Sequence, residues 1–597
     1  MTRLTVGKTG AGIATLCALG CGEPAGPQET VHRTSISSNE TWTRAASPHV
    51  VQGLVHVGGG ATLTIEAGAT VIFKPLGSLT FGGVGSGSLQ ANGTAAEPIT
   101  MRGEDTATTP WIGIAFRGSA VSEMHYVNVS DCGRDYIPDS LPPACILLGK
   151  PLTSDAPSLL IDHVTVSDGV EVAILAKNGS SFADGSTTLS VSNMRGHIAT
   201  VPADEATRFP RGGSFTANDS NEVRLTVDTV RASATWTGDV PWNVIGPVSI
   251  EGNAQPVLTI PAGTTLRMTG AIIVGKNLPG GLRIGSDGGA TVTLRSAGSS
   301  RWAGVDFSAH AVNSSITNAV LEHCGSYQEG RTSGGCVSIA GRWDDSSDIA
   351  PEPVLKNVTV RDAIDAGIVL SYGGKFGAGS SNLTITGTVG TGGGFGTGSP
   401  LVVFQSSFGS IPPGQYTGNA RDWIWTYELE LRQDDTWRKH DVPYVIYAFL
   451  SIGDSITHPT VTIEPGVTVI LDVAAKLQVG WDAPGVLHAV GTATQPITFT
   501  GVVATPGSWA GVVIGPHADT ASRFDHVLVE YGGAPYPVAG SYHFYKDIGP
   551  VIRNSVIRHS AGCGVIIVNQ PPWFTDFTAP ALANTFSNNA GGSICGP

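Results

Sequence analysis

Hydrophobic and polar residues alternate in short runs along most of the chain. In the segment 62–73, for example, Leu63 and Ile65 alternate with Thr62 and Thr64. A period of two residues is typical of half-buried β-strands. The runs are rich in β-branched residues and end at Gly, Asn, Asp or Pro, which favour turns. No stretch shows the apolar stripe of a long amphipathic helix, so the pattern predicts an all-β protein.

One series of strands occurs three times. The sequence TLTIEAGATVIF at 62–73 returns as VLTIPAGTTLRM at 257–268 and as TVTIEPGVTVIL at 460–471. Each copy is followed by a W-x-G strand, which begins at Trp111, Trp302 and Trp509. Recurrence in register over this distance indicates homologous units. We place them at 29–221, 222–422 and 423–597, the third one shortened.

Short strands without helices fit either a solenoid or a string of sandwiches. A sandwich needs hairpins with tight two-residue turns, whereas most connections here are Gly-rich bends between strands that look alike. Ala-Gly or Pro-Gly at 67–68, 262–263 and 465–466 provides one such bend, because glycine readily adopts positive φ. The pattern therefore predicts a right-handed parallel β-helix with coils about 4.8 Å apart. The recurring tryptophans are expected to pack in its core or at the edge of a coil.

The strands resemble those of the pectin-lyase-like superfamily. They are more similar to bacterial surface and lipoprotein β-helix repeats, which carry a TLTIEPGTTV-like strand, a PITF strand and a W-x-G-I strand. The matching segments here include EPITM at 97–101, QPITF at 495–499 and WIGIAF at 111–116. The resemblance covers nearly all of 29–597 and implies the fold, but it specifies no single function.

Composition narrows the class of protein further. The chain has 79 glycines, 14% charged residues and a net charge of -14. It is too apolar for a disordered chain, and it lacks the Ala, Glu, Lys and Leu enrichment of a coiled coil. It has no run of Lys and Arg, so we expect no nucleic-acid partner. It also lacks an apolar run of about 18 residues that would indicate a membrane helix.

The N-terminus has the features of an export signal. Arg3 and Lys8 precede a short uncharged stretch at 10–20 that ends at Cys21. This arrangement resembles a bacterial lipoprotein signal, which implies a signal peptide at 1–21, lipid on Cys21 and a linker at 22–28. The alternative is an ordinary signal peptide with an incidental cysteine. The expected location is the cell envelope, lipid-anchored at the outer membrane or cell surface, which Gly22 after the cysteine favours.

Six cysteines follow the signal, and the repeat suggests how they pair. Cys132 and Cys324 occupy one position in the first two units, and Cys145 and Cys336 occupy another. Equivalent positions should form equivalent bonds, so we pair Cys132 with Cys145 and Cys324 with Cys336. The third unit lacks both halves. The last pair would be Cys563 with Cys595, unless Cys563 is a small buried residue and Cys595 a free thiol.

Two segments resemble parts of pectate lyases. Ile161-Asp162-His163 is similar to their IDH strand, and RFPRGG at 208–213 is similar to their arginine-containing strand. This resemblance implies Ca²⁺ ligands at Asp168 and Glu171 and a catalytic arginine at Arg208 or Arg211. Asp162 and His163, however, align with Lys356-Asn357 and Arg553-Asn554 of the other units. The repeat therefore explains them as turn residues, which weakens the lyase interpretation without removing it.

Other candidates lie in the loops. A run of carboxylates in the second unit is a weak candidate for Ca²⁺, with solvated loop residues as the alternative; it comprises Asp344, Asp345 and Asp348. A looser equivalent in the first unit comprises Asp131, Asp135 and Asp139. The variable loop after the W-x-G strand carries a tyrosine in every unit, at Tyr136, Tyr327 and Tyr536, and the third copy adds Tyr542 and Tyr545. Such rings suit stacking on sugars, although they can equally pack the loop onto its coil.

These observations favour a non-enzymatic envelope lipoprotein that is structural or adhesive. Its expected partners are its lipid anchor and a polysaccharide or another surface protein, and no cofactor is expected apart from the weak Ca²⁺ candidates. The alternative is a polysaccharide lyase or glycoside hydrolase of the same fold. An enzyme would need one groove with converging acids, bases or Ca²⁺ ligands.

Overall fold

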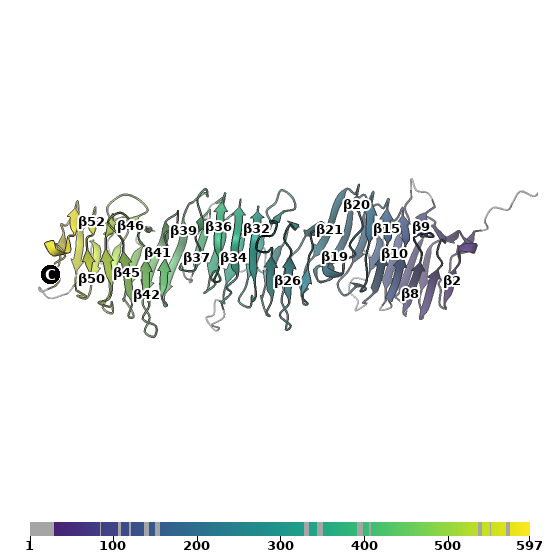
Figure 1. Cartoon of the computed structure of the whole chain (residues 1–597), viewed down its shortest axis with the longest axis horizontal. Helices are drawn as coiled ribbons and strands as arrows, with labels where there is room; N and C mark the ends of the chain where they lie inside the picture. The colour runs from purple at the N-terminus through teal and green to yellow at the C-terminus, as the bar shows by residue number, and fades with distance from the viewer. Residues whose placement is uncertain are drawn as a thin grey trace, which may run out of the picture.

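The protein is an elongated rod (Figure 1). The computed structural model describes residues 29–596, apart from 84, 105–108, 119–120, 136–142, 150–155, 327–333, 343–349, 391–397, 405–407, 474, 535–539, 550 and 569–573. Its strands run from β1 (Thr30–His32) at one end of the rod to β55 (Ile594–Cys595) at the other.

The coils of the first unit show the basic arrangement of three strands, whereas in the second unit the long strands β32 (Ser315–Glu322) and β34 (Val354–Arg361) each span two faces. One coil consists of β5 (Ala61–Ile65), β6 (Thr70–Phe73) and β7 (Ser78–Gly82). The next consists of β8 (Gly87–Asn92), β9 (Ile99–Gly103) and β10 (Gly113–Arg117). The pairings are parallel and join equivalent strands: β5 with β8, β6 with β9 and β7 with β10. The chain therefore forms the predicted parallel β-helix. We call the face through β6 and β9 face A, that through β7 and β10 face B, and that through β5 and β8 face C.

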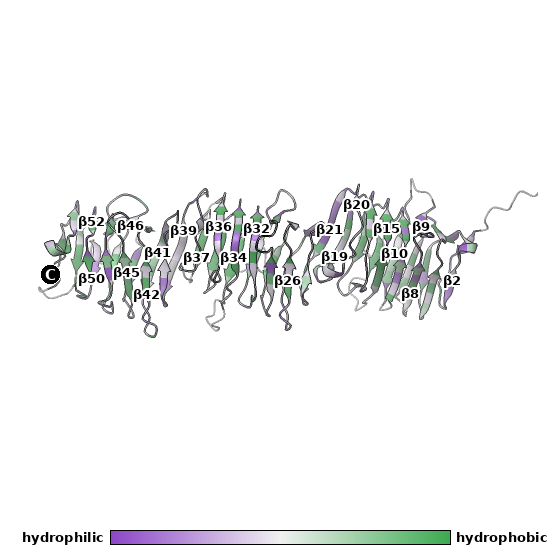
Figure 2. Cartoon of the chain, viewed as in Figure 1, coloured by the Kyte–Doolittle hydropathy of each residue, from purple (hydrophilic) through white to green (hydrophobic). Residues whose placement is uncertain are grey.

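The interior of the rod is one continuous hydrophobic core. Leu63 and Ile65 on β5 and Val71 and Phe73 on β6 are buried, whereas the residues between them are partly exposed. Hydrophobic and hydrophilic residues are mixed along the strands over the whole rod (Figure 2). This alternation is the period of two seen in the sequence, with one side chain of each pair facing inward.

The recurring tryptophans lie in the core, as expected. Trp111, Trp302 and Trp509 are fully buried. Each indole Nε1 donates a hydrogen bond to a backbone carbonyl 2.8 to 2.9 Å away, on Ser130, Glu322 and Glu530 respectively. The predicted bends are also present, since Gly68, Gly263 and Gly466 adopt φ of 73°, 79° and 78°.

The faces shift by one position at two junctions along the rod. At the first junction, β19 (His197–Pro202) on face B pairs with β21 (Ser220–Thr226), and β21 pairs with β24 (Trp242–Val244). β24 then pairs with β27 (Thr265–Met268), whose sequence corresponds to β6 on face A. At the second junction, β37 (Leu401–Phe404), β39 (Ile424–Leu431), β41 (Tyr444–Ile452) and β43 (Thr468–Leu471) form the same series. Face B of one unit thus continues as face A of the next.

Three disulfides and three short 3₁₀ helices complete the described fold. The disulfides join Cys132 to Cys145 and Cys324 to Cys336, which are the pairs that the repeat suggests, and Cys563 to Cys595, the pair that then remains. The helices are η1 (Arg44–Ala46), η3 (Ala203–Arg208) and η4 (Pro580–Leu582). Among the described residues, no helix has the length and apolar character needed to cross a membrane.

Candidate functional site

Asp162 and His163 form a corner of the first unit. Asp162 ends β14 (Ser158–Asp162), and His163 lies between it and β15 (Val164–Ser167) with φ of 54°. Asn357 and Asn554, the residues aligned with His163 in the other units, have φ of 53° and 48°. All three positions therefore have the left-handed conformation that a sharp corner requires.

This corner belongs to an edge that runs along the first unit. Its residues on successive coils, which we call the His163 edge, are Tyr126, His163, Thr188 and Arg211. Backbone hydrogen bonds join neighbouring corners: the Tyr126 amide donates to Asp162 O at 2.9 Å, and the Thr188 amide donates to Arg211 O at 2.6 Å. The rings of Tyr126 and His163 stack with their centroids 4.4 Å apart. The edge thus presents a phenol, an imidazole and a guanidinium in one row.

The Asp162 carboxylate is held by three neighbours at this edge. Its Oδ1 lies 2.7 Å from His163 Nδ1 and accepts a 2.7 Å hydrogen bond from Thr187 Oγ1, and its Oδ2 lies 3.3 Å from His125 Nδ1. Burial raises the pKa of Asp162, but the hydrogen bonds from Thr187, His125 and His163 outweigh it, so the net pKa lies below its ordinary value. Asp162 therefore stays ionised and orients the two imidazoles.

Asp168 and Glu171 lie on a different edge. They fall between β15 and β16 (Val172–Ala176), at the end of β15 opposite to His163. The five residue steps from His163 to Asp168 along this strand separate the two corners by roughly 16 Å. Asp168 Oδ1 accepts a 3.3 Å hydrogen bond from Asn193 Nδ2, and Glu171 is exposed. The structure therefore divides the lyase candidates between two edges.

Arg208 and Arg211 line an open pocket of about 670 Å³ at the first junction. We call it the junction pocket. Its walls come from three consecutive coils: Ala183, Asp184, Gly185, Ser186 and Thr187; Thr207, Arg208, Phe209, Arg211 and Gly212; and Asp239. Thr187 links the pocket to the His163 edge, because its hydroxyl donates to Asp162. The lining includes hydroxyl, carboxylate and guanidinium groups as well as apolar surface from Ala183 and Phe209.

The two arginines of the junction pocket differ in their partners. Arg208 NH1 lies 3.1 Å from Glu205 Oε1, and Arg208 Nε lies 3.6 Å from Asp184 Oδ1. Burial raises the pKa of Glu205, while Arg208 lowers it. Arg211 NH1 instead donates to the Thr237 hydroxyl at 2.8 Å. The positive charge of Arg211 is therefore the one better placed to meet a ligand.

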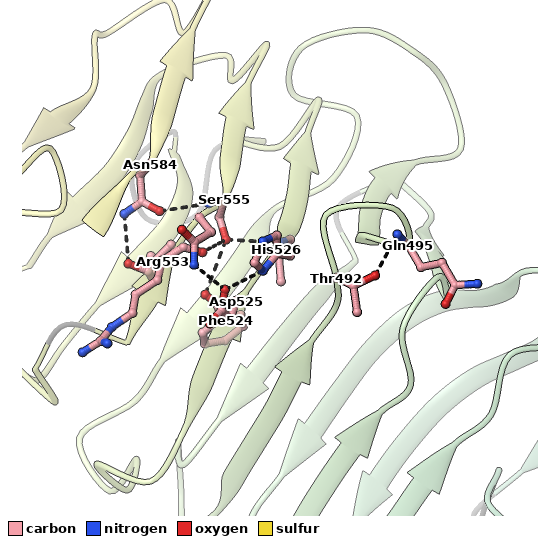
Figure 3. Close-up of polar contacts among 11 residues, drawn as sticks. Thr492, Gln495, Phe524, Asp525, His526, Arg553, Ser555 and Asn584 are labelled. Carbon is pink, nitrogen blue, oxygen red and sulfur yellow. Dashed lines mark hydrogen bonds and ion pairs between the residues drawn. The ribbon is translucent and has the colours of Figure 1, made fainter. Parts of the chain in front are cut away.

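The other two units build the same edge from different residues. In the second unit it is a ladder of amides: Asn382 Nδ2 donates to Asn357 Oδ1 at 2.8 Å, and Asn357 Nδ2 donates to Asn318 Oδ1 at 2.9 Å. In the third unit, Asp525 Oδ1 lies 2.8 Å from His526 Nδ1 (Figure 3). The same oxygen accepts a hydrogen bond from Asn554 Nδ2 at 2.9 Å. The junction pocket adjoins this edge in the first unit, through Thr187.

Several candidates from the loops lie outside the described residues. They are Tyr136, Tyr327 and Tyr536 for sugar stacking, and Asp139, Asp344, Asp345 and Asp348 for Ca²⁺. Cys21 lies outside them as well. Within the described residues, no cluster of three or more His, Cys, Asp or Glu side chains is arranged to hold a metal ion.

The remaining loop candidates are placed by the structure. Asp131 is buried and accepts a 2.8 Å hydrogen bond from Ser130 Oγ, and Asp135 is exposed. Tyr542 is fully buried in the core, and Tyr545 packs against Trp481 with ring centroids 4.8 Å apart.

Sequence reasoning did not single out His125, Tyr126 or Asp239. Tyr126 could have been found by extending the alignment of the corners to the preceding coil, where it occupies the position of Asn318 in the second unit and His526 in the third. Asp239 enters the junction pocket only through the stacking of the coils, which no local pattern reveals.

Comparisons with known proteins add little to this picture. No protein-family model matches the chain, and no curated protein matches it. Among solved structures, the crystal structure of an alginate lyase from Paenibacillus sp. aligns with 72% of this chain and 93% of that chain, at 10% identity and a TM-score of 0.14. An alignment this weak gives no information about activity. The assignment of the fold therefore depends on the strand pairings, and any proposal about function depends on the site.

Proposed function

We propose that this protein is a non-catalytic rod of the bacterial envelope that binds a polysaccharide. The observation that carries the proposal is the junction pocket, an open cavity of about 670 Å³ on the side of the rod. Its lining of hydroxyl, carboxylate and guanidinium groups matches the hydrogen-bonding groups of a sugar chain, and its openness suits a chain that continues past the site. Arg211 can pair with a carboxylate, so polyuronates are the first ligands to test.

The arrangement of charged groups favours binding over catalysis. Elimination from a uronate needs a base and a group that neutralises the carboxylate to converge on one sugar. Here the Asp162 carboxylate is occupied by Thr187, His125 and His163, and the supposed Ca²⁺ ligands Asp168 and Glu171 lie on another edge. A polysaccharide lyase remains the second candidate function, because Arg211 and the pocket would serve it too.

The binding proposal is tested by titrating the protein with alginate, polygalacturonate and neutral oligosaccharides in a calorimeter. We expect Arg211→Ala to weaken binding about tenfold or more, because a hydrogen bond to a charged group is lost. Arg283→Ala is the matched control, since Arg283 is also exposed but lies on β29 (Gly281–Ile284), away from the pocket. Wild-type affinity in Arg211→Ala, or no binding of any oligosaccharide, would contradict the proposal.

The absence of catalysis is tested separately. Incubation with polygalacturonate or alginate in the presence of Ca²⁺ should give no absorbing unsaturated product. A product that forms with the wild type and not with Arg211→Ala would instead establish the lyase alternative.

We also propose that Cys21 carries a lipid that anchors the rod at the outer membrane or cell surface. The residues 18–21 and the preceding uncharged stretch support this proposal. Multiple acyl chains hold a protein firmly at a bilayer, whereas a protein without them is released. The Cys21→Ser protein should therefore leave the membrane fraction when cells are fractionated. Retention of the variant in the membrane would exclude the lipid anchor.

A further inference from the structure

A second surface with binding chemistry lies on the outside of the rod at the second junction. The strands there are β35 (Ile368–Ser371), β37, β39 and β41. Their outward residues pair in register, Val369 with Val402, Val402 with Trp425 and Trp425 with Val445. This is the solvent-facing side of a sheet, where polar residues are usual. An apolar row at this position therefore calls for an explanation.

At the first junction, the positions equivalent to this apolar row are occupied by polar and charged residues. Arg224 on β21 corresponds to Trp425 on β39, and it pairs in register with Asn243. Arg224 Nε lies 2.6 Å from Glu222 Oε1, and Asn243 Nδ2 donates to Glu222 Oε2 at 2.8 Å. The β-helix thus accommodates a cluster of charged and polar side chains at this position of the first junction. The hydrophobic residues at the other junction are not a requirement of the β-helix.

Aromatic rings cover this apolar row and form what we call the aromatic platform. It comprises Phe404, Trp423, Trp425, Tyr427 and Tyr447. The rings of Tyr427 and Tyr447 stack with centroids 5.4 Å apart, and Trp425 lies 6.2 Å from Tyr447 and 5.7 Å from Phe404. The contacts cross from coil to coil, so the rings form a row along the axis of the rod.

The exposed part of the platform consists mainly of aromatic rings, with the aliphatic Ile470 partly exposed beside them. Val402, Trp425 and Val445 are only 2% to 3% exposed, whereas Tyr447 is 39% exposed and Tyr427 is partly exposed. A stable protein interface buries about 800 Å² on each partner, which a few ring faces do not supply. Ring faces with phenolic hydroxyls at their edges instead match a ligand that has both C–H faces and hydroxyl groups.

The charges beside the platform are paired within the protein. The Arg421 guanidinium lies 5.4 Å from the centroid of the Trp423 ring, and Arg432 NH2 lies 2.6 Å from Glu430 Oε2. Glu430 offsets the charge of Arg432, and the Arg421 guanidinium keeps its charge but is held against the face of the Trp423 ring. An uncharged ligand fits this surface better than an anionic one.

We propose that the aromatic platform binds a neutral polysaccharide, whose sugar rings stack on Tyr427 and Tyr447 along the axis of the rod. This site is separate from the junction pocket and does not depend on the function proposed for that pocket.

The test is affinity electrophoresis of the whole protein in native gels that contain hydroxyethylcellulose, galactomannan or xylan. The experiment uses the Arg211→Ala protein, so that the junction pocket does not contribute to retardation. We expect this protein to be retarded in at least one of the neutral gels and in no gel that contains alginate. Tyr427→Ala combined with Tyr447→Ala should weaken binding about tenfold or more, since each stacked ring contributes. Tyr447→Phe should keep most of the affinity.

Tyr531→Ala is the matched control, because Tyr531 is a partly exposed tyrosine that stacks on His559 outside the platform. Thermal unfolding of each variant verifies that it is folded. Wild-type retardation in the double variant, or no retardation in any neutral gel, would overturn the proposal. A dimer in sedimentation experiments that dissociates in the double variant would overturn it in favour of self-association.

Discussion

The glycine two residues after each core tryptophan is fixed by its neighbours. Gly113, Gly304 and Gly511 adopt φ of 138°, 115° and 124°. A Cβ on Gly304 would lie 2.3 Å from the carbonyl oxygen of Cys336 on the next coil. The W-x-G sequence therefore combines a side chain that fills the core with a residue that lets the next coil stack closely.

This geometry predicts that Gly304→Ala destabilises the protein. Positive φ and the contact with Cys336 should together cost about 1–3 kcal/mol, which lowers the midpoint of thermal unfolding. Gly298→Ala is the control, because a Cβ there meets no atom within 4 Å. Equal midpoints for the two variants would show that the close approach at Gly304 relaxes freely.

At the scale of elements, the corners are held by ladders of side chains. Asn318, Asn357 and Asn382 adopt φ of 50° to 53°, and their amides form a continuous chain of hydrogen bonds. Asparagine tolerates this conformation better than most residues, and its side-chain amide also forms hydrogen bonds with the asparagines of the neighbouring coils. In the first unit, stacked rings of Tyr126 and His163 occupy the corresponding positions.

Asn357→Ala should remove two hydrogen bonds of the ladder and place alanine at positive φ, with an expected cost of about 1–2 kcal/mol in unfolding free energy. Asn588→Ala separates the two effects. Asn588 has φ of 54°, but its side chain has no hydrogen bond within the described part of the chain. The first variant should therefore have the lower midpoint in denaturant titrations. A larger loss for Asn588→Ala would contradict a stabilising role of the ladder.

Much of the element scale could be predicted from the sequence, because the repeat marks equivalent positions. Aligning Asp162-His163 with Lys356-Asn357 identified a corner, and the equivalent cysteines gave the same pairs that the structure contains. The aromatic platform was missed, although Trp423, Trp425 and Tyr427 at every second residue carry a signal. Periodicity does not tell which face of a strand points outward, and the junction pocket depends on coil stacking.

At the scale of the whole molecule, buried histidines make stability depend on pH. Burial lowers the pKa of His197 and of His440 to about 4. Burial also lowers the pKa of His32 and His49. In each case the unfolded chain, with a histidine pKa of about 6.5, binds a proton that the folded chain excludes.

The unfolding free energy should therefore fall as the pH drops from about 6.5 to about 4, with His440 alone contributing on the order of 3 kcal/mol. His440→Phe, which keeps a ring against Tyr416 and Tyr444, should reduce this loss. Thermal midpoints at pH 7, 5.5 and 4.5 for both proteins measure the effect. Parallel pH curves would show that His440 does not contribute.

The shift of faces at the two junctions limits multivalent binding. Because face B of one unit continues as face A of the next, the same face of successive units points in a different direction around the rod. A straight polymer lying along the axis can engage only one copy of any feature that the repeat supplies three times. Avidity requires several sites that one ligand can occupy at the same time. The three units of a single rod do not offer such sites to a straight polymer. Tight attachment would instead require several rods side by side, each offering the same face to the polymer.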